Sequence, residues 1–187
     1  MQRSICALTA VLFLIRPICP AEPIGQEPSD EVQINTPYVE TAPPVVDAML
    51  RLAKTKRKDV VYDLGCGDGR IVIAAAKQYG ARGVGIDINP VRIQQAQDNA
   101  RREGVQNLVT FKIGDVYNAD VREATIVALY MLPDVNLKLR PKLWQDLRPG
   151  ARIISHTFDM GDWKPKRVKA VGSEKVFLWV QKKPKRA

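Results

Sequence analysis

The sequence predicts an α/β fold of the doubly wound type, in which a mostly parallel sheet carries helices on both faces. Three observations predict it. From Asp59 onward, short apolar runs alternate with helical patterns. A glycine-rich segment lies between the first of these strands and the helix that follows it. Aspartates follow three successive predicted strands, at the edge where open α/β sheets bind their ligands.

A short N-terminal leader precedes the predicted domain. Residues 1–21 combine Arg3, an apolar run over residues 5–15 and the small-residue site Cys19-Pro20-Ala21. This pattern is typical of a cleaved secretory signal, because the apolar run is short for a membrane span. We therefore expect an exported or periplasmic protein. The alternative is an uncleaved leader that anchors the protein to a membrane through residues 1–21.

The segment after the leader is predicted to be a linker. Residues 22–36 are rich in Pro, Gln, Glu and Ser. The folded domain is expected to cover residues 37–187. Cys6 and Cys19 lie in the leader, so a processed chain keeps only Cys66 and cannot form an internal disulfide.

Strand and helix patterns alternate through the domain. The predicted strands cover residues 60–64, 83–87, 108–113, 125–129 and 152–157. The predicted helices begin at Pro43, Arg70, Pro90 and Val135. The chain closes with strands at 167–171 and 175–181, which Gly172-Ser173 joins without a helix. We therefore expect about seven strands, with one antiparallel strand at an edge of the sheet.

The glycine-rich segment, DLGCGDGR over residues 63–70, indicates the kind of ligand. Gly65 and Gly67 allow the backbone to turn tightly and to approach a ligand closely. A dinucleotide-binding loop needs a small residue where this chain has Arg70. Asp63 would repel a phosphate and is well placed to pair with an ammonium group. The segment therefore favours a nucleoside ligand that carries an amino group over a dinucleotide.

Two further aspartates follow the next strands. Asp87 ends the second strand, where a carboxylate can accept hydrogen bonds from both hydroxyls of a ribose. Asp115 follows the third strand and can accept from an adenine amino group, with Val116 covering the ring. A single aspartate in such a place is often only a turn or capping residue. Three of them at successive strand ends favour a binding site.

Two residues are candidates for the chemistry itself, and the sequence assigns neither. Tyr130 begins the segment YMLPD after the fourth strand, which either meets a second substrate or forms a turn with a core Met131 and a capping Asp134. His156, near the end of the fifth strand, could act as a base. A lone histidine without a partner in the sequence is more often structural.

Composition argues against some partners. Lysine and arginine number 29 against 20 aspartates and glutamates, a net charge of +9. We interpret the excess as a solvated surface, because the few aromatic residues do not alternate with the basic ones as they do in nucleic-acid platforms. No nucleic-acid partner is therefore expected. No metal site is expected either, since Cys-His spacing is absent.

With these motifs in place, the chain resembles a class I methyltransferase with a Rossmann-like fold. More narrowly, it resembles the ATP synthase c-subunit lysine N-methyltransferase family and its bacterial relatives. The residues that carry the resemblance are Pro37-Tyr38-Val39, residues 63–77, Gly85-Ile86-Asp87-Ile88-Asn89-Pro90, Gly150-Ala151-Arg152-Ile153-Ile154 and Trp163-Lys164-Pro165. Two positions depart from the family pattern: Asp87 replaces the usual glutamate, and Glu40 replaces a proline.

The resemblance implies S-adenosylmethionine as the methyl donor. The residues it implies for binding are Asp63, Gly65, Gly67, Asp87, Asp115 and Val116, and it adds Tyr38. It also implies a protein lysine near a membrane as the methyl acceptor. A small-molecule methyltransferase and a non-catalytic protein that binds adenosyl ligands are the alternatives. The oligomeric state is not predicted.

Overall fold

The computed structural model describes residues 39–182 of the 187-residue chain. The predicted leader, the linker and Tyr38 lie outside the described residues. The strands are β1 (Val60–Leu64), β2 (Arg82–Asp87), β3 (Val109–Ile113), β4 (Ile126–Leu129), β5 (Arg152–His156), β6 (Arg167–Val171) and β7 (Glu174–Val180). The helices are α1 (Pro43–Leu52), α2 (Arg70–Tyr79), α3 (Pro90–Arg102) and α4 (Pro133–Asp146), with a 3₁₀ turn η1 (Val116–Asn118).

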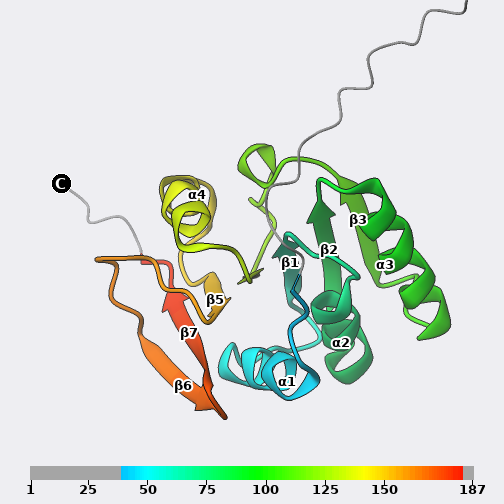
Figure 1. The fold of residues 1–187 in the computed structure, drawn as a ribbon, viewed down its shortest axis with the longest axis horizontal. Coiled ribbons are helices and arrows are strands. Elements are labelled where there is room, and N and C mark those ends of the chain that lie inside the picture. The colour runs from blue at the N-terminus through cyan, green and yellow to red at the C-terminus, as the bar shows by residue number, and fades with distance from the viewer. Residues whose placement is uncertain (1–38, 183–187) are drawn as a thin grey trace, which may run out of the picture. The chain divides into compact units, whose positions relative to one another are not determined.

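All seven strands form one sheet in the order β3-β2-β1-β4-β5-β7-β6 (Figure 1). The strands from β3 to β5 in this order are parallel, and β7 is antiparallel to both of its neighbours. The predicted doubly wound fold is therefore confirmed, including a single reversed strand among those described. That strand lies one place inside the edge, because the hairpin at Gly172 folds β7 back between β5 and β6.

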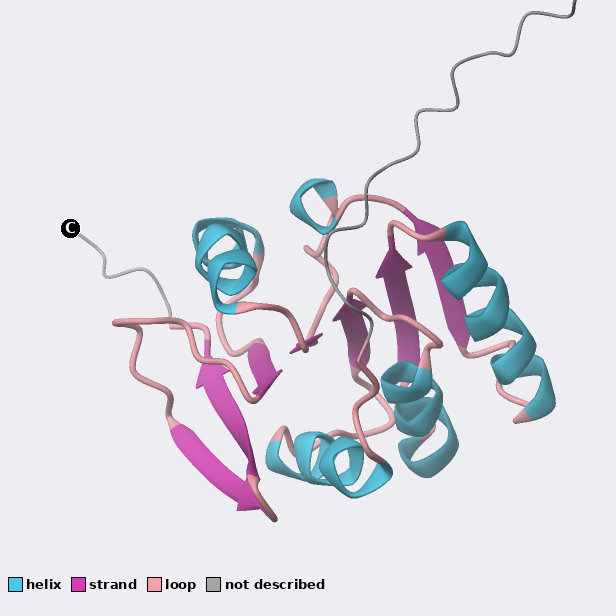
Figure 2. Cartoon of the chain, in the orientation of Figure 1, coloured by secondary structure: helices cyan, strands magenta, loops and turns pink. Residues whose placement is uncertain are grey.

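Helices cover both faces of the sheet, and each face has its own core. Figure 2 shows α1 and α2 side by side, with α4 apart from them. In β1, Val61 packs into the core shared with α1 and α2, while Val60 and Tyr62 pack into the core shared with α4. Successive side chains of β1 therefore point to opposite faces of the sheet, as expected of a strand that is buried on both sides. Each fully buried aliphatic side chain contributes about 1.5–3 kcal/mol to these cores.

The amino-terminal ends of the central strands are joined by a buried ion pair. Asp59, which is 3% exposed, pairs with Arg152 at the start of β5. The same carboxylate accepts from the hydroxyl of Thr125 at 2.8 Å and from the amide of Lys56 at 2.8 Å. The Asp59 carboxylate therefore has both a partner of opposite sign and neutral donors, as a buried charge requires. Among residues 39–182, no helix is long and apolar enough to cross a membrane.

Gly69 combines a left-handed backbone with close packing, so its replacement by alanine should be costly. Its φ is +79°, and an added Cβ would lie 2.6 Å from the ring of Phe111 and 2.9 Å from Cβ of Ala96. We expect Gly69→Ala to lower the free energy of unfolding by about 2–4 kcal/mol, from backbone strain and overpacking together. Urea denaturation measures this loss.

Gly104 provides the control. Its φ is +69°, yet an added Cβ would meet nothing within 4 Å. Gly104→Ala should therefore lose only the strain of about 1–2 kcal/mol. Equal losses in the two variants would contradict the packing argument.

Candidate functional site

A pocket of about 400 Å³ lies at the carboxyl ends of β1, β2 and β4, where the strand order reverses between β1 and β4. Open α/β sheets bind ligands at such a reversal, and the volume suits a small molecule. The predicted site residues that line it are Asp63, Gly65, Asp87, Asp115, Val116 and Tyr130. Gly67 and His156 do not line it, and Tyr38 lies outside the described residues.

The glycine loop between β1 and α2 is built from left-handed turns. Gly65, Gly67 and Gly69 all have positive φ, at +79°, +51° and +79°. The amides of Gly65 and Cys66 both donate to the carbonyl of Ile86 at 2.8 and 3.0 Å, which fixes the loop against β2. A Cβ on Gly65 would lie 2.5 Å from Sδ of Met131. The positive φ favours glycine at position 65, and any larger residue there would also displace the Met131 side chain.

Asp87 is held in the pocket by backbone amides. One carboxylate oxygen accepts from the amide of Gly67 at 2.8 Å, and the other accepts from the amide of Asn89 at 2.9 Å. Each oxygen has a further lone pair, so the carboxylate can still accept from two ligand hydroxyls. Gly67 thus orients Asp87 rather than lining the pocket, so its predicted part in binding would be indirect.

Asp63 lies at the end of β1 and is only 2% exposed. Burial, together with the negative charges of Asp87 and Asp68, raises the pKa of Asp63 to about 8. Because this value exceeds the unfolded value of 3.8, the contribution of the group to stability is lost as the pH rises through about 8. A ligand ammonium beside Asp63 would restore the charge balance, so the residues present fit an amino-acid moiety.

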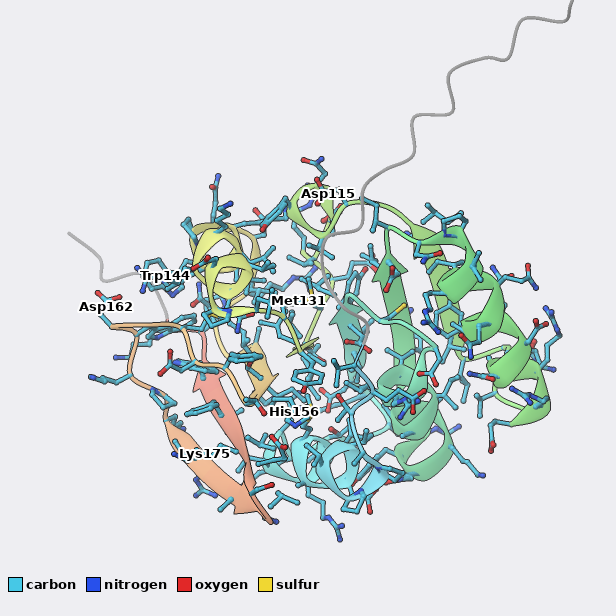
Figure 3. The ribbon with its side chains drawn as sticks, viewed as in Figure 1. Asp115, Met131, Trp144, His156, Asp162 and Lys175 are labelled. Carbon is cyan, nitrogen blue, oxygen red and sulfur yellow. The ribbon has the colours of Figure 1, made fainter. Side chains whose placement is uncertain are left out.

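The opposite end of the pocket is less polar. Asp115 caps η1, where its carboxylate accepts from the amide of Tyr117 at 2.9 Å, and it also lines the pocket (Figure 3). Val116 is buried beside it, and Ile88, 38% exposed, lines the same region. An acceptor oxygen next to apolar side chains suits the amino group and ring of a purine. The capping role of Asp115 is therefore compatible with a binding role.

The segment after β4 forms the remaining wall. Tyr130 and Met131 line the pocket, and Leu132, not Asp134, is the capping residue of α4. Met131 also packs against the core beneath α4. The two interpretations of this segment are thus not exclusive, because the turn itself lines the pocket. Burial raises the pKa of Tyr130, with Glu174 adding to the rise, so this phenol stays protonated at neutral pH.

His156, the last residue of β5, packs against Tyr130 and does not line the pocket (Figure 3 labels the side chain). The imidazole is 3% exposed, and its ring centre is 3.9 Å from that of Tyr130. Burial lowers the pKa of His156, and Glu174 only partly opposes this, so the ring is neutral near pH 7. His156 therefore supports Tyr130 from outside the pocket, and its position does not favour direct contact with a substrate.

Several pocket residues were not predicted from the sequence. They are Val39, Glu40, Thr41, Cys66, Asp68, Arg70, Ile71, Ile88, Asn89, Arg92, Gly114 and Met131. Asp68 and Arg70 stand out, because the Arg70 guanidinium forms a two-point fork with the Asp68 carboxylate at 2.9 and 2.6 Å. The Asp-x-Arg spacing was a usable signal, since the same fork recurs between Asp120 and Arg122. Within the described range, no group of three or more potential ligands could hold a metal ion.

Comparison with known proteins assigns the chain to a family. A model described as the ANTKMT methyltransferase domain matches residues 63–167, which include the glycine loop and Asp87. The chain belongs to this family. It is 44% identical over 135 residues to a protein-lysine N-methyltransferase from Saccharolobus islandicus, a match that covers 72% of this chain and 84% of that protein. It is 32% identical over 143 residues to the human ATP synthase c-subunit lysine N-methyltransferase, covering 76% of this chain and 60% of the human protein.

Similar solved structures contain a product of the methyl donor. An RNA methyltransferase from Salinibacter ruber in complex with S-adenosyl-L-homocysteine is 51% identical, with a TM-score of 0.77 over 79% of this chain and 98% of that one. A methyltransferase from Thiobacillus denitrificans with the same ligand is 25% identical, with a TM-score of 0.57 over 62% of this chain and 48% of that one. The protein is an S-adenosylmethionine-dependent methyltransferase.

Removing the Asp87 carboxylate should weaken ligand binding. Asp87→Ala leaves two ribose hydroxyls without their charged acceptor, at a cost of about 1.5–3 kcal/mol for bonds to a charged group. We expect calorimetry with S-adenosylhomocysteine to show a loss of affinity of that size. Wild-type affinity in a folded Asp87→Ala protein would contradict the assignment.

Ligand binding should release a proton from Asp63. Below about pH 8 the buried carboxyl holds a proton, and an ammonium at that place displaces it. Between pH 6 and pH 8, affinity for S-adenosylhomocysteine should therefore rise with pH. At pH 7, the binding enthalpy should differ between phosphate and Tris buffers by nearly the difference in their ionisation enthalpies. The Asp63→Asn variant is the control and should show neither effect.

Proposed function

We propose that the protein transfers a methyl group from S-adenosylmethionine to a lysine amine of another protein. The observation that carries this proposal is the charge of the pocket. Five acidic side chains line it, against two guanidinium groups, Arg70 and Arg92. Asp63 is the one among them that holds a proton near neutral pH, until an ammonium group binds beside it. A lysine approaches as a cation and is attracted by this lining, while a polyanion is repelled. The lysine methyltransferases among the relatives support the same acceptor.

The chain's residues would serve the reaction mainly by alignment. When bound, S-adenosylmethionine supplies an activated methyl group whose leaving group is neutral, so no acid is needed to assist departure. Asp63 and Asp87 bind and orient the donor, and they hold no proton that the transfer requires. Tyr130 and Met131 exclude water from the β4 side of the pocket.

A lysine must lose its proton before it attacks. A free lysine has a pKa of about 10.4, and transfer into an apolar environment lowers that value. Tyr130 and Met131 on the β4 side, and Val39 in the segment before α1, supply apolar surface to the pocket. Desolvation of the entering side chain would therefore favour the neutral, nucleophilic amine without a dedicated base.

An RNA acceptor is the second candidate, because the Salinibacter ruber structure, 51% identical to this chain, is described as an RNA methyltransferase. The acidic lining disfavours it, since binding to nucleic acid depends on neutralising phosphates with basic groups. A small-molecule acceptor is a third candidate, and ligand binding without turnover is a fourth. We also propose that residues 1–21 direct the enzyme to the cell envelope, which would place its acceptor close to a membrane.

One labelling experiment separates these candidates. The enzyme is incubated with methyl-tritiated S-adenosylmethionine and a cell lysate that has been divided into envelope proteins, soluble proteins, RNA and low-mass compounds. We expect label in the envelope proteins, released as methyllysine on acid hydrolysis. The Asp87→Ala variant is the control and should label far less.

Each remaining outcome would reject a stated part of the proposal: the acceptor, the turnover or the location. Label in RNA or in the low-mass fraction would establish an RNA or a small-molecule acceptor. Absence of label in every fraction, from a protein that binds S-adenosylhomocysteine, would indicate a binding protein without turnover. Methyllysine confined to soluble proteins would retain the reaction and reject the envelope location.

A further inference from the structure

One wall of the pocket comes from residues 39–41, which precede α1 and are called here the N-terminal strap. The strap is contacted from two directions by side chains that the transfer does not use. We infer that Arg70 and His156 are positioning residues that hold the strap against the donor pocket from its two sides. This inference goes beyond the proposed function and does not depend on the identity of the acceptor.

Arg70 ties the strap to the glycine loop. Its fork on Asp68 fixes the guanidinium beside the loop. From there, one amino group donates to the backbone carbonyl of Thr41 at 3.0 Å, and the other pairs with the Glu40 carboxylate at 2.9 Å. The Arg70 side chain is only 25% exposed, and planar guanidinium groups lose little freedom per bond. The loop therefore determines where the strap lies.

His156 ties the same strap to the other side of the site. The hydroxyl of Thr41 lies 3.2 Å from Nδ1 of His156. Because the ring is neutral, Nδ1 can accept from this hydroxyl while Nε2–H faces the Glu174 carboxylate, 3.5 Å away. That carboxylate accepts from the hydroxyl of Thr157 at 2.6 Å, which fixes it in turn. His156, on β5, therefore links the strap to Glu174 on β7, and its position fixes where the Thr41 hydroxyl lies.

Thr41 is the strap residue that both side chains contact. Its carbonyl accepts a hydrogen bond from Arg70, and its hydroxyl contacts Nδ1 of His156. Because Thr41 lines the pocket and His156 does not, a change at His156 can reach the ligand only through a neighbour. Tyr130, whose ring packs against the same imidazole, is the second such neighbour. The test must therefore separate the strap contact from the ring contact.

Two substitutions at His156 separate them, with S-adenosylhomocysteine affinity as the readout. His156→Phe keeps a ring against Tyr130 and removes the partner of the Thr41 hydroxyl. His156→Asn removes the ring and keeps an acceptor oxygen near the place of Nδ1. We expect about 10-fold weaker binding for His156→Phe and a change of less than about 3-fold for His156→Asn. The reverse order, or equal losses, would overturn the role of the strap.

A double-variant cycle tests the contact directly. Thr41→Val should weaken binding about as much as His156→Phe, because each leaves one buried polar group without its partner. The combined variant should bind no more weakly than either single variant, since neither group then remains unpaired. Additive losses would overturn the inference. A lower melting temperature with unchanged affinity in all three variants would also overturn it, because the contact would then serve stability alone.

Arg122 offers a matched control for Arg70. It forms the same fork, with Asp120 at 2.9 and 2.6 Å, and it lies exposed and away from the strap. Arg70→Lys keeps the charge but cannot form the fork and reach the strap together, so we expect about 10-fold weaker binding. Arg122→Lys should bind as the wild type does. Equal affinity in both variants would exclude Arg70 as a positioning residue.

Discussion

The site depends on the close approach of carboxylates at the carboxyl ends of β1 and β2. Asp63, Asp68 and Asp87 lie near enough that Asp87 and Asp68 both raise the pKa of Asp63. Like charges at such distances repel strongly inside a protein. The proton that Asp63 keeps below about pH 8 relieves part of this repulsion, and local contacts fix the other two carboxylates. The left-handed glycine turns, the Gly67 amide on Asp87 and the Arg70 fork on Asp68 do so. A ligand ammonium group beside Asp63 would complete the charge balance of this cluster.

The amino-terminal ends of the strands, opposite the pocket, hold a buried carboxylate whose partners all belong to the protein. Asp59 is as deeply buried as Asp63, yet it has Arg152, Thr125 and a backbone amide as partners. The two hydrophobic cores lie on the faces of the sheet, between these two ends of the strands. The two carboxylates therefore differ in their immediate partners: Asp59 has a cation beside it, whereas burial and other carboxylates raise the pKa of Asp63. This local difference distinguishes the pocket end of the sheet from the other end. Unfavourable charge at the site is tolerated because the rest of the fold is well packed.

Much of this arrangement could be predicted, because the local signals agree with the global fold. The strand period, the prolines that begin helices and the aspartates at strand ends all indicated a doubly wound sheet. The place of β7 could not be predicted, since pairing order in a hairpin depends on contacts with β5 that leave no periodic signal. The supporting roles of Arg70 and His156 were missed for a similar reason. Their partners, Thr41 and Glu174, are distant in sequence, and only the folded chain brings them together.

Met131 has a consequence for how this enzyme can change over evolution. Its sulfur packs against Gly65, and the same side chain lines the wall that follows β4. A substitution that alters this side chain in the course of evolution therefore changes the pocket wall and the glycine loop at the same time. An unbranched thioether can bend into new shapes at little cost, so Met131 can adapt to small shifts of either neighbour. The two parts of the pocket are thus coupled through one flexible side chain.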